Sequence, residues 1–248
     1  MKLFRLIRSP ILGAARNMAV DGIIYQRYLE DGIGVLRLYR WEAPSFTFGF
    51  SQKPEELLDL EACAKDDIGV AKRITGGGLL FHDDEITYSF ACSKSDINEA
   101  PGVLVDYRNI CRFLLRFYET LGLCPVFALQ EPDFKDKSVP HEICSAAYEK
   151  YDIVIDGRKI GGNAQKRNRQ MIFQHGSIPI RVNWEKARRY FKPAAATVPI
   201  MATCLAQELN PLPDRAVLEQ KLLDAFSAVF EVTFKEETGV GHETSLVA

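Results

Sequence analysis

The stretch Lys72–Asp84, with the sequence KRITGGGLLFHDD, imposes the strongest local constraint on how this chain folds. Three consecutive glycines, Gly76–Gly78, interrupt a sequence that otherwise resembles a strand. Glycine adopts backbone conformations that other residues avoid and allows a ligand to approach the main chain closely. A glycine run inside a strand also weakens it, because glycine loses more conformational freedom on folding. The stretch therefore predicts either a glycine-rich turn between two strands or a ligand-binding loop.

The residues on either side of the glycines favour a site for an anion. Arg73 precedes the glycines, and His82 and Asp83 follow them. Free backbone N–H groups and arginine side chains both bind carboxylate or phosphate groups. The stretch is not a Walker A loop, because no Gly-Lys-Ser/Thr follows at the required spacing. A carboxylate or phosphate site is thus the alternative to a plain turn.

Length and composition restrict the class of protein. The 248 residues predict one large domain, or one domain with a small appendage. A net charge of −2 and an isoelectric point near 6.1 argue against general nucleic-acid binding. No apolar run approaches the roughly 20 residues that span a bilayer, and charges interrupt the N-terminal segment where a signal peptide would be apolar. We expect a cytoplasmic protein that binds neither nucleic acid nor membrane.

The cysteines do not suggest a disulfide framework, because the chain contains no Cys-x-x-Cys pair and is expected to be cytoplasmic. Most of them are expected to be small buried apolar residues. Cys144 differs, because it follows the polar loop Gln130–Ile143. A thiolate in that position can accept an acyl group if nearby cations lower the pKa of the thiol. The six cysteines are Cys63, Cys92, Cys111, Cys124, Cys144 and Cys204.

Strand and helix patterns alternate irregularly along the chain. A helix is expected over Pro10–Tyr28, with Asp21 as a solvated or capping carboxylate. Val35–Tyr39 and Ser45–Phe50 have alternating strand patterns, and their short connection predicts a hairpin-like pair. Val103–Leu121 keeps apolar side chains at three-four spacing and is the clearest helix. The pattern predicts an α+β fold with a mixed, largely antiparallel sheet flanked by helices, rather than a doubly wound parallel sheet.

Lys159 follows a strong hairpin signal, Asp156-Gly157. Crossing that hairpin can return the lysine toward Cys144. An ammonium group there would favour the thiolate and polarise a thioester or carboxylate oxygen. The alternative is an exposed turn lysine, which the surrounding glycines make less favoured.

The histidines leave other chemistries open. His82, His141 or His175 can in principle supply the base of a Cys-His dyad. His175 lies in an apolar strand, where a lone histidine is more often a structural residue. His141 and Cys144 have the spacing of half a zinc site, but no second ligand pair follows, so no metal site is predicted.

Several motifs, taken in order, resemble the biotin/lipoate protein ligase superfamily and in particular its octanoyl-transferring branch. Asn17–Asp21 resembles part of the family's N-terminal helix, and Arg40–Gln52 resembles its first hairpin. Arg73–Asp83 is similar to the signature acyl-binding loop. Gly157–Gln165, with the sequence GRKIGGNAQ, and Gln174–Ser177 are similar to the segment that carries the family's lysine. Together these motifs cover most of the chain.

The resemblance implies the catalytic-domain fold of that superfamily and the activity of an octanoyltransferase. Cys144 and Lys159 are the implied catalytic residues, because the cysteine precedes the lysine segment as it does in the transferases. The implied donor is octanoyl acyl carrier protein. The implied acceptor is the lysine of a lipoyl domain, either glycine cleavage H protein or a 2-oxoacid dehydrogenase E2, and no cofactor is implied. The implied substrate-binding residues are Arg73, Thr75, Gly76, Gly77, Gly78, His82, Gly162, Ala164 and His175.

Three other functions are compatible with the same motifs. An ATP-dependent lipoate-protein ligase would need ATP and Mg, and the triple glycine resembles that branch, because many of the transferases carry a larger residue in place of Gly78. An amidotransferase would move the octanoyl group from one lipoyl domain to another. A non-catalytic module would bind an acyl chain without turnover. The predicted single domain 1–248 has only a short helical C-terminal tail from about residue 192, too short for a full accessory domain, which favours a transferase.

Overall fold

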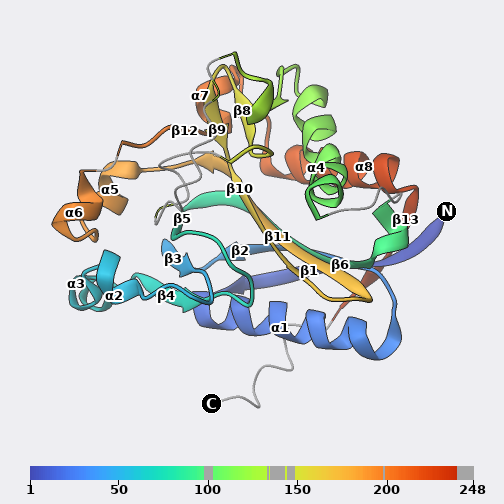
Figure 1. The fold of residues 1–248 in the computed structure, drawn as a ribbon, viewed down its shortest axis with the longest axis horizontal. Helices are drawn as coiled ribbons and strands as arrows, with labels where there is room; N and C mark the ends of the chain where they lie inside the picture. Colours follow the sequence, from blue (N-terminus) through green and yellow to red (C-terminus); the bar gives the residue numbers. More distant parts are fainter. Residues whose placement is uncertain (98–102, 133, 135–142, 144–148, 198, 239–248) are drawn as a thin grey trace.

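A six-stranded mixed sheet forms the centre of the computed structural model, which describes residues 1–97, 103–132, 134, 143, 149–197 and 199–238 (Figure 1). The strands from the first edge to the fourth position pair antiparallel, and the last two join in parallel. The predicted mixed, largely antiparallel sheet is therefore confirmed. In spatial order its strands are β10 (Gly162–Arg167), β11 (Met171–Arg181), β6 (Asp84–Ser93), β2 (Val35–Trp41), β1 (Lys2–Leu12) and β13 (Val232–Glu237).

Two smaller sheets lie beside the central one (Figure 1). The first carries the strands on both sides of the glycine stretch, in the order β4 (Gly69–Lys72), β3 (Ser45–Phe48) and β5 (Leu80–His82). The second carries Lys159, in the order β12 (Ala202–Thr203), β9 (Arg158–Ile160), β8 (Ile153–Ile155) and β7 (Val126–Phe127). The fold thus brings two separate motifs to the two ends of one site.

Helices cover both faces of the central sheet (Figure 1). α1 (Ala14–Asp31) packs Val20 and Ile24 on one face, against Phe173. α4 (Val103–Thr120) and α8 (Arg215–Phe230) pack their apolar faces on the other. None of the helices in the described ranges is both long and apolar enough to cross a membrane. The shorter helices are α2 (Pro54–Leu57), α3 (Leu60–Lys65), α5 (Trp184–Arg188), α6 (Pro193–Ala196) and α7 (Leu205–Glu208), with 3₁₀ turns at Lys94–Ile97 and Ala128–Gln130.

Two local predictions are wrong. Pro10 does not open a helix but lies within β1, at a register shift between Arg8 and Ile11 in the pairing with β2. Proline cannot donate a ladder hydrogen bond, so an irregularity of this kind tolerates it. β2 and β3 do not pair as a hairpin, because β2 joins β1 and β6, whereas β3 pairs with β4 and β5.

The end of the chain contributes to the central sheet. The described residues after 192 form three helices and two short strands. β12 pairs with β9, and β13 pairs in parallel with β1. α8 packs Phe226 into the main core against Phe90 and Phe113. The C-terminal segment is therefore part of the same core as the strands that carry the site.

Candidate functional site

Arg73 shapes the glycine stretch from inside. The side chain is buried, and Nη1 donates to Thr47 O at 2.7 Å and to Thr47 Oγ1 at 3.0 Å. Nη2 donates to the carbonyl oxygens of Gly76 at 3.1 Å and Gly78 at 2.8 Å. The guanidinium thus holds two loop carbonyls and the neighbouring strand together, and fixes the curvature of the loop.

Glycine is needed at two positions of this arrangement. Gly77 has φ +93°, which L side chains rarely adopt, and a Cβ atom there would lie 3.3 Å from Arg73 Nη2. Gly49 faces the loop, and a Cβ atom on it would lie 2.2 Å from the carbonyl oxygen of Gly77. The two segments therefore approach each other closely along their backbones.

Two cavities meet at the glycine stretch, and we call them the inner and the outer cavity. Counting the space at their mouths, their volumes are about 400 Å³ and about 770 Å³. Both are lined by Gly77, Gly78, Asn163 and Ala164. The inner cavity is also lined by Met18, Tyr39, Thr47, Arg73, Leu80, His82, Thr87, Gly162, His175 and Gly176, and the outer cavity by Gly76, Tyr107, Glu149, Asp152, Lys159 and Gln165.

Lys159 lines the outer cavity and is 4% exposed, so it is not an exposed turn lysine. Its Nζ lies 2.7 Å from Oδ2 of the buried Asp152. The predicted hairpin is confirmed, because β8 and β9 pair antiparallel around Asp156 and Gly157, both with positive φ. This turn returns the lysine into the core, where Asp152 supplies the opposite charge that a buried ammonium requires.

His82 stands at the inner cavity with both ring nitrogens hydrogen-bonded. Nε2 lies 2.7 Å from Thr47 Oγ1, and Nδ1 lies 2.8 Å from Glu85 Oε1. The ring stacks on Trp41 with centroids 4.0 Å apart. Burial alone would raise the pKa of Glu85, but the charge of His82 and hydrogen bonds from His82 and Ser177 hold that pKa below its ordinary value. His82 is thus held in one orientation by a buried carboxylate.

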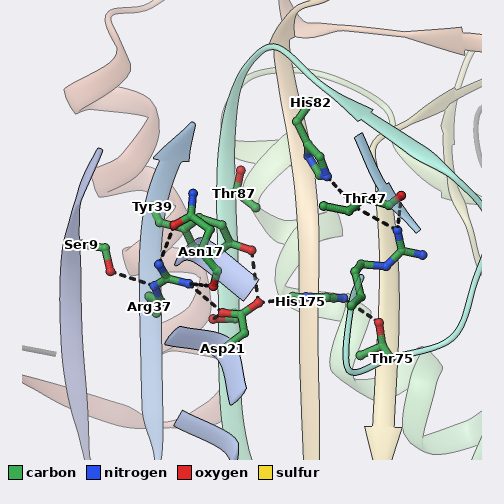
Figure 2. A network of polar contacts seen from close by, with 12 residues as sticks. Ser9, Asn17, Asp21, Arg37, Tyr39, Thr47, Thr75, His82, Thr87 and His175 are labelled. Carbon is green, nitrogen blue, oxygen red and sulfur yellow. Dashed lines mark hydrogen bonds and ion pairs between the residues drawn. The ribbon is translucent and has the colours of Figure 1, made fainter. Parts of the chain in front are cut away.

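His175, which also lines the inner cavity, has the same arrangement of hydrogen-bond partners (Figure 2). Its Nε2 lies 2.7 Å from Thr75 Oγ1, and its Nδ1 lies 3.0 Å from Asp21 Oδ2. Burial lowers the pKa of His175, and the hydrogen bond and charge of Asp21 oppose this only in part. His175 is therefore a hydrogen-bonded structural residue that also lines a cavity.

Asp21 is buried rather than solvated or capping, so that prediction is wrong (Figure 2). Arg37, which is also fully buried, donates from Nη1 to Asp21 Oδ1 at 2.8 Å and from Nη2 to Asn17 Oδ1 at 2.7 Å. Burial alone would raise the pKa of Asp21, but the hydrogen bond from His175 and the charge of Arg37 hold it below its ordinary value. A charged partner on a distant strand thus permits a carboxylate on the buried face of α1.

Cys144 and His141 lie outside the described residues. Ile143, the residue bonded to Cys144, is buried and forms a β-bridge with Leu79, directly after the glycine stretch. Of the other cysteines, Cys63, Cys92, Cys111 and Cys204 are buried as expected, and Cys124 is exposed. Within the described ranges, no group of three or more His, Cys, Asp or Glu side chains is arranged to hold a metal ion.

The predicted site residues that the structure describes lie around the two cavities. Thr75 is hydrogen-bonded to His175, Gly76 and Lys159 line the outer cavity, and the inner cavity is lined by Arg73, Gly77, Gly78, His82, Gly162, Ala164 and His175. Sequence reasoning missed Asn163, which borders both cavities. The available signal was its position between Gly162 and Ala164, which the resemblance implies to be substrate-binding residues.

Known proteins with similar sequences identify the family. The family model for the lipoyl protein ligase A/B catalytic domain matches residues 13–227. Octanoyltransferase LipM of Bacillus cereus is 32% identical over 233 residues, which cover 91% of this chain and 84% of the relative. LipM of Geobacillus kaustophilus is 33% identical over 238 residues, covering 93% and 86%.

A solved structure shows the same fold. The putative lipoate protein ligase from T. acidophilum with bound lipoic acid superposes with a TM-score of 0.76 at 22% identity, covering 98% of this chain and 92% of that one. The family match covers most of the chain, and the fold agrees with it. The chain therefore belongs to the lipoyl protein ligase A/B catalytic-domain family.

Proposed function

We propose that this chain is an octanoyltransferase of lipoate biosynthesis. It would move an octanoyl group from octanoyl acyl carrier protein, through a thioester on Cys144, to the lysine of a lipoyl domain. Relatives about one third identical over most of the chain are named octanoyltransferases, which supports the acyl group. The observation that carries the proposal is the meeting of the inner and outer cavities at one shared wall.

The inner cavity suits the hydrocarbon tail. Its two histidines already have partners for both ring nitrogens, so burying a chain beside them leaves neither imidazole unsatisfied. An octanoyl tail has about seven methylene or methyl groups, and burying them contributes roughly 5 kcal/mol at ~0.8 kcal/mol each. The outer cavity, with Lys159, then receives the acyl carbonyl.

The two steps of the transfer conserve atoms and charge. The Cys144 thiolate attacks the donor thioester, a new C–S bond forms, and the bond to the carrier thiol breaks. The acceptor amine then attacks the Cys144 thioester, forms an amide and releases the cysteine as a thiolate. The proton lost by the amine balances the proton taken up by the carrier thiolate. The Lys159 ammonium would stabilise the oxyanion in both steps.

The nearest described neighbour of Cys144 supports its role. Ile143 pairs with Leu79, which follows Gly78 in the shared wall of the two cavities. Ile143, the residue before Cys144, therefore lies beside the wall at which the proposed thioester would react.

Mass spectrometry of the intact protein mixed with octanoyl acyl carrier protein tests the proposal. We expect a mass gain of one octanoyl group on the wild type and on Cys124→Ser, a control at the exposed cysteine. Cys144→Ser should show no adduct. Adding the lipoyl domain of H protein or E2 should discharge the adduct without ATP.

Other results would point to the alternatives. ATP-dependent transfer of free octanoate, unaffected by Cys144→Ser, would contradict the thioester route and indicate a ligase. An adduct formed from an octanoylated lipoyl domain, but not from the carrier protein, would indicate amidotransfer. Octanoate binding without an adduct or turnover would indicate a non-catalytic module.

A further inference from the structure

Asn163, Gly176 and Tyr88 are neighbours across three strands of the central sheet. Asn163 on β10 pairs with Gly176 on β11, which pairs with Tyr88 on β6. The Tyr88 hydroxyl donates to Asn163 Oδ1 over the glycine between them. A Cβ atom on Gly176 would lie 2.1 Å from that oxygen and 2.6 Å from the hydroxyl. The absent side chain therefore makes this hydrogen bond feasible.

A chain of hydrogen bonds with a fixed direction ends at Asn163. It begins at Arg167, whose guanidinium only donates and binds Gln165 Oε1 through Nε at 2.7 Å and also through Nη2. The Gln165 amide must therefore donate its Nε2–H to Gln174 Oε1. Gln174 Nε2 in turn donates to the Tyr88 hydroxyl at 2.7 Å, and that hydroxyl donates to Asn163 Oδ1.

The direction of these hydrogen bonds decides which polar atom of Asn163 can bind a substrate. Its Oδ1 is occupied, so Nδ2 is the remaining polar atom of the side chain, and it donates to no described residue. Asn163 is half-buried. A fully buried Nδ2 without a partner is not found among the described residues, so this atom is accessible to solvent. Burial raises the pKa of Tyr88 well above its ordinary value, so the hydroxyl keeps its proton. The structure thus presents an oriented amide donor beside both cavities.

We propose that Asn163 is a catalytic residue that binds the acyl carbonyl oxygen through its Nδ2–H groups. This inference rests on the proposed function. As a nucleophile adds to the carbonyl carbon, the π electron pair moves onto oxygen, and it returns when the carrier thiolate or Cys144 departs. Asn163 donates hydrogen bonds throughout and neither gains nor loses a proton. A donor fixed before the reaction stabilises an oxyanion without the cost of reorienting.

Single-turnover transfer from octanoyl acyl carrier protein to Cys144, followed by quenched mass spectrometry, tests this role. Asn163→Asp keeps an oxygen for Tyr88 and the shape of the side chain, but replaces the donor with an acceptor. We expect the rate to fall about 10²–10³-fold, the range for loss of one oxyanion donor. Asn163→Ala should lose a similar factor, and it keeps the test valid if the aspartate variant fails to fold.

Asn168→Asp is the matched control, because it makes the same change just beyond the end of β10. Asn168 Oδ1 accepts from the backbone N–H groups of Gln170 and Met171, and aspartate retains both bonds. Its transfer rate should stay close to that of the wild type. A control that lost as much as Asn163→Asp would assign the effect to added charge and overturn the inference.

Tyr88 is a positioning residue, and its test is a double-mutant cycle. Tyr88→Phe should lower the rate by about tenfold in the wild type and little further in Asn163→Ala, because the two act as a unit. If both Asn163 variants transfer at the wild-type rate and form the normal adduct on Cys144, the inference is wrong but the proposed function stands. A wild type that forms no adduct would instead remove the proposed function and the inference with it.

Discussion

The inner and outer cavities share a wall of four residues but differ in how their polar groups are used. Around the inner cavity, His82 and His175 direct both ring nitrogens to neighbouring side chains. The outer cavity is lined by the ion pair of Lys159 with Asp152, and Asn163, whose Nδ2 donates to no described residue, borders both cavities. Neutral polar groups that satisfy one another define a shape, whereas an ammonium group and an amide donor that line a cavity can stabilise charge on a substrate. The inner cavity therefore suits selection of the tail, and the outer one suits the chemistry.

Removing the cation of the outer cavity should have the largest effect. Lys159→Met should slow acyl transfer by at least ~10²-fold, because the oxyanion loses its charged partner. It should also destabilise the fold by about 3–5 kcal/mol, because Asp152 is left buried without its cation. Transfer kinetics and urea unfolding measure the two effects. The exposed Lys72→Met is the control and should change stability by no more than about 0.5 kcal/mol.

A double variant separates charge pairing from catalysis. Asp152→Asn added to Lys159→Met removes the unpaired carboxylate, so much of the lost stability should return. Transfer should remain slow, because the ammonium group is still absent. Recovery of both properties would show that Lys159 serves only the fold.

The shared wall should respond to a single methyl group. Gly77→Ala forces a side chain onto φ +93° and against Arg73, so we expect a loss of about 1–2 kcal/mol in stability and about tenfold in transfer. Gly157→Ala is the matched control, because that residue has φ +70° and open space around it. Both variants should unfold at a lower urea concentration than the wild type, but only Gly77→Ala should slow acyl transfer. Equal kinetics in the two would argue against the wall as part of the site.

The preference for one acyl-chain length over another should depend on the inner cavity and not on the outer one. Met18 lines the inner but not the outer cavity and packs against Tyr39 and Trp41. Met18→Ala should shift the preference toward longer acyl chains by about fourfold per methylene, from ~0.8 kcal/mol for each group buried. Competition between octanoyl and decanoyl carrier proteins measures the ratio. Met18→Leu conserves most of the volume and should leave it unchanged.

The smallest expected effect is a pH dependence of stability. Because burial holds the pKa of His175 below its ordinary value of 6.5, the unfolded chain binds more protons as the pH falls through this value. The stabilisation is thus fully present above pH 6.5 and declines below it. As the pH is lowered from 7 to 5, the urea midpoint of unfolding should fall less steeply for His175→Gln than for the wild type. An equal slope in the two proteins would contradict a depressed pKa.

A second decline at lower pH has a different origin and serves as the internal reference. The pKa of Glu85 is held below its ordinary value of 4.5, so its contribution is present above that pH and is lost as the pH falls through the folded pKa. This decline should occur in both the wild type and His175→Gln. Its presence in both would locate the difference near neutral pH at His175.

The sequence by itself determined the elements that depend on local rules. The apolar spacing of Val103–Leu121 predicted α4, which ends at Thr120 before Gly122 with φ +80°. Asp156-Gly157 predicted the hairpin that carries Lys159, and the ordered motifs indicated the family. Helical periodicity and turn chemistry act over a few residues, so they can be read from a short stretch of sequence.

Only the tertiary structure decided how the polar side chains are paired. Asp21 and His175 are 154 positions apart, and Thr75 and His175 are 100 positions apart, yet each pair is hydrogen-bonded. The sequence placed Asp21 in solvent because its partner, Arg37, lies on a strand whose pairing was also mispredicted. Asn163 was overlooked because its orientation depends on Tyr88 across a glycine in the neighbouring strand. Burial and hydrogen-bond direction depend on what the whole fold places around a group, so local pattern cannot specify them.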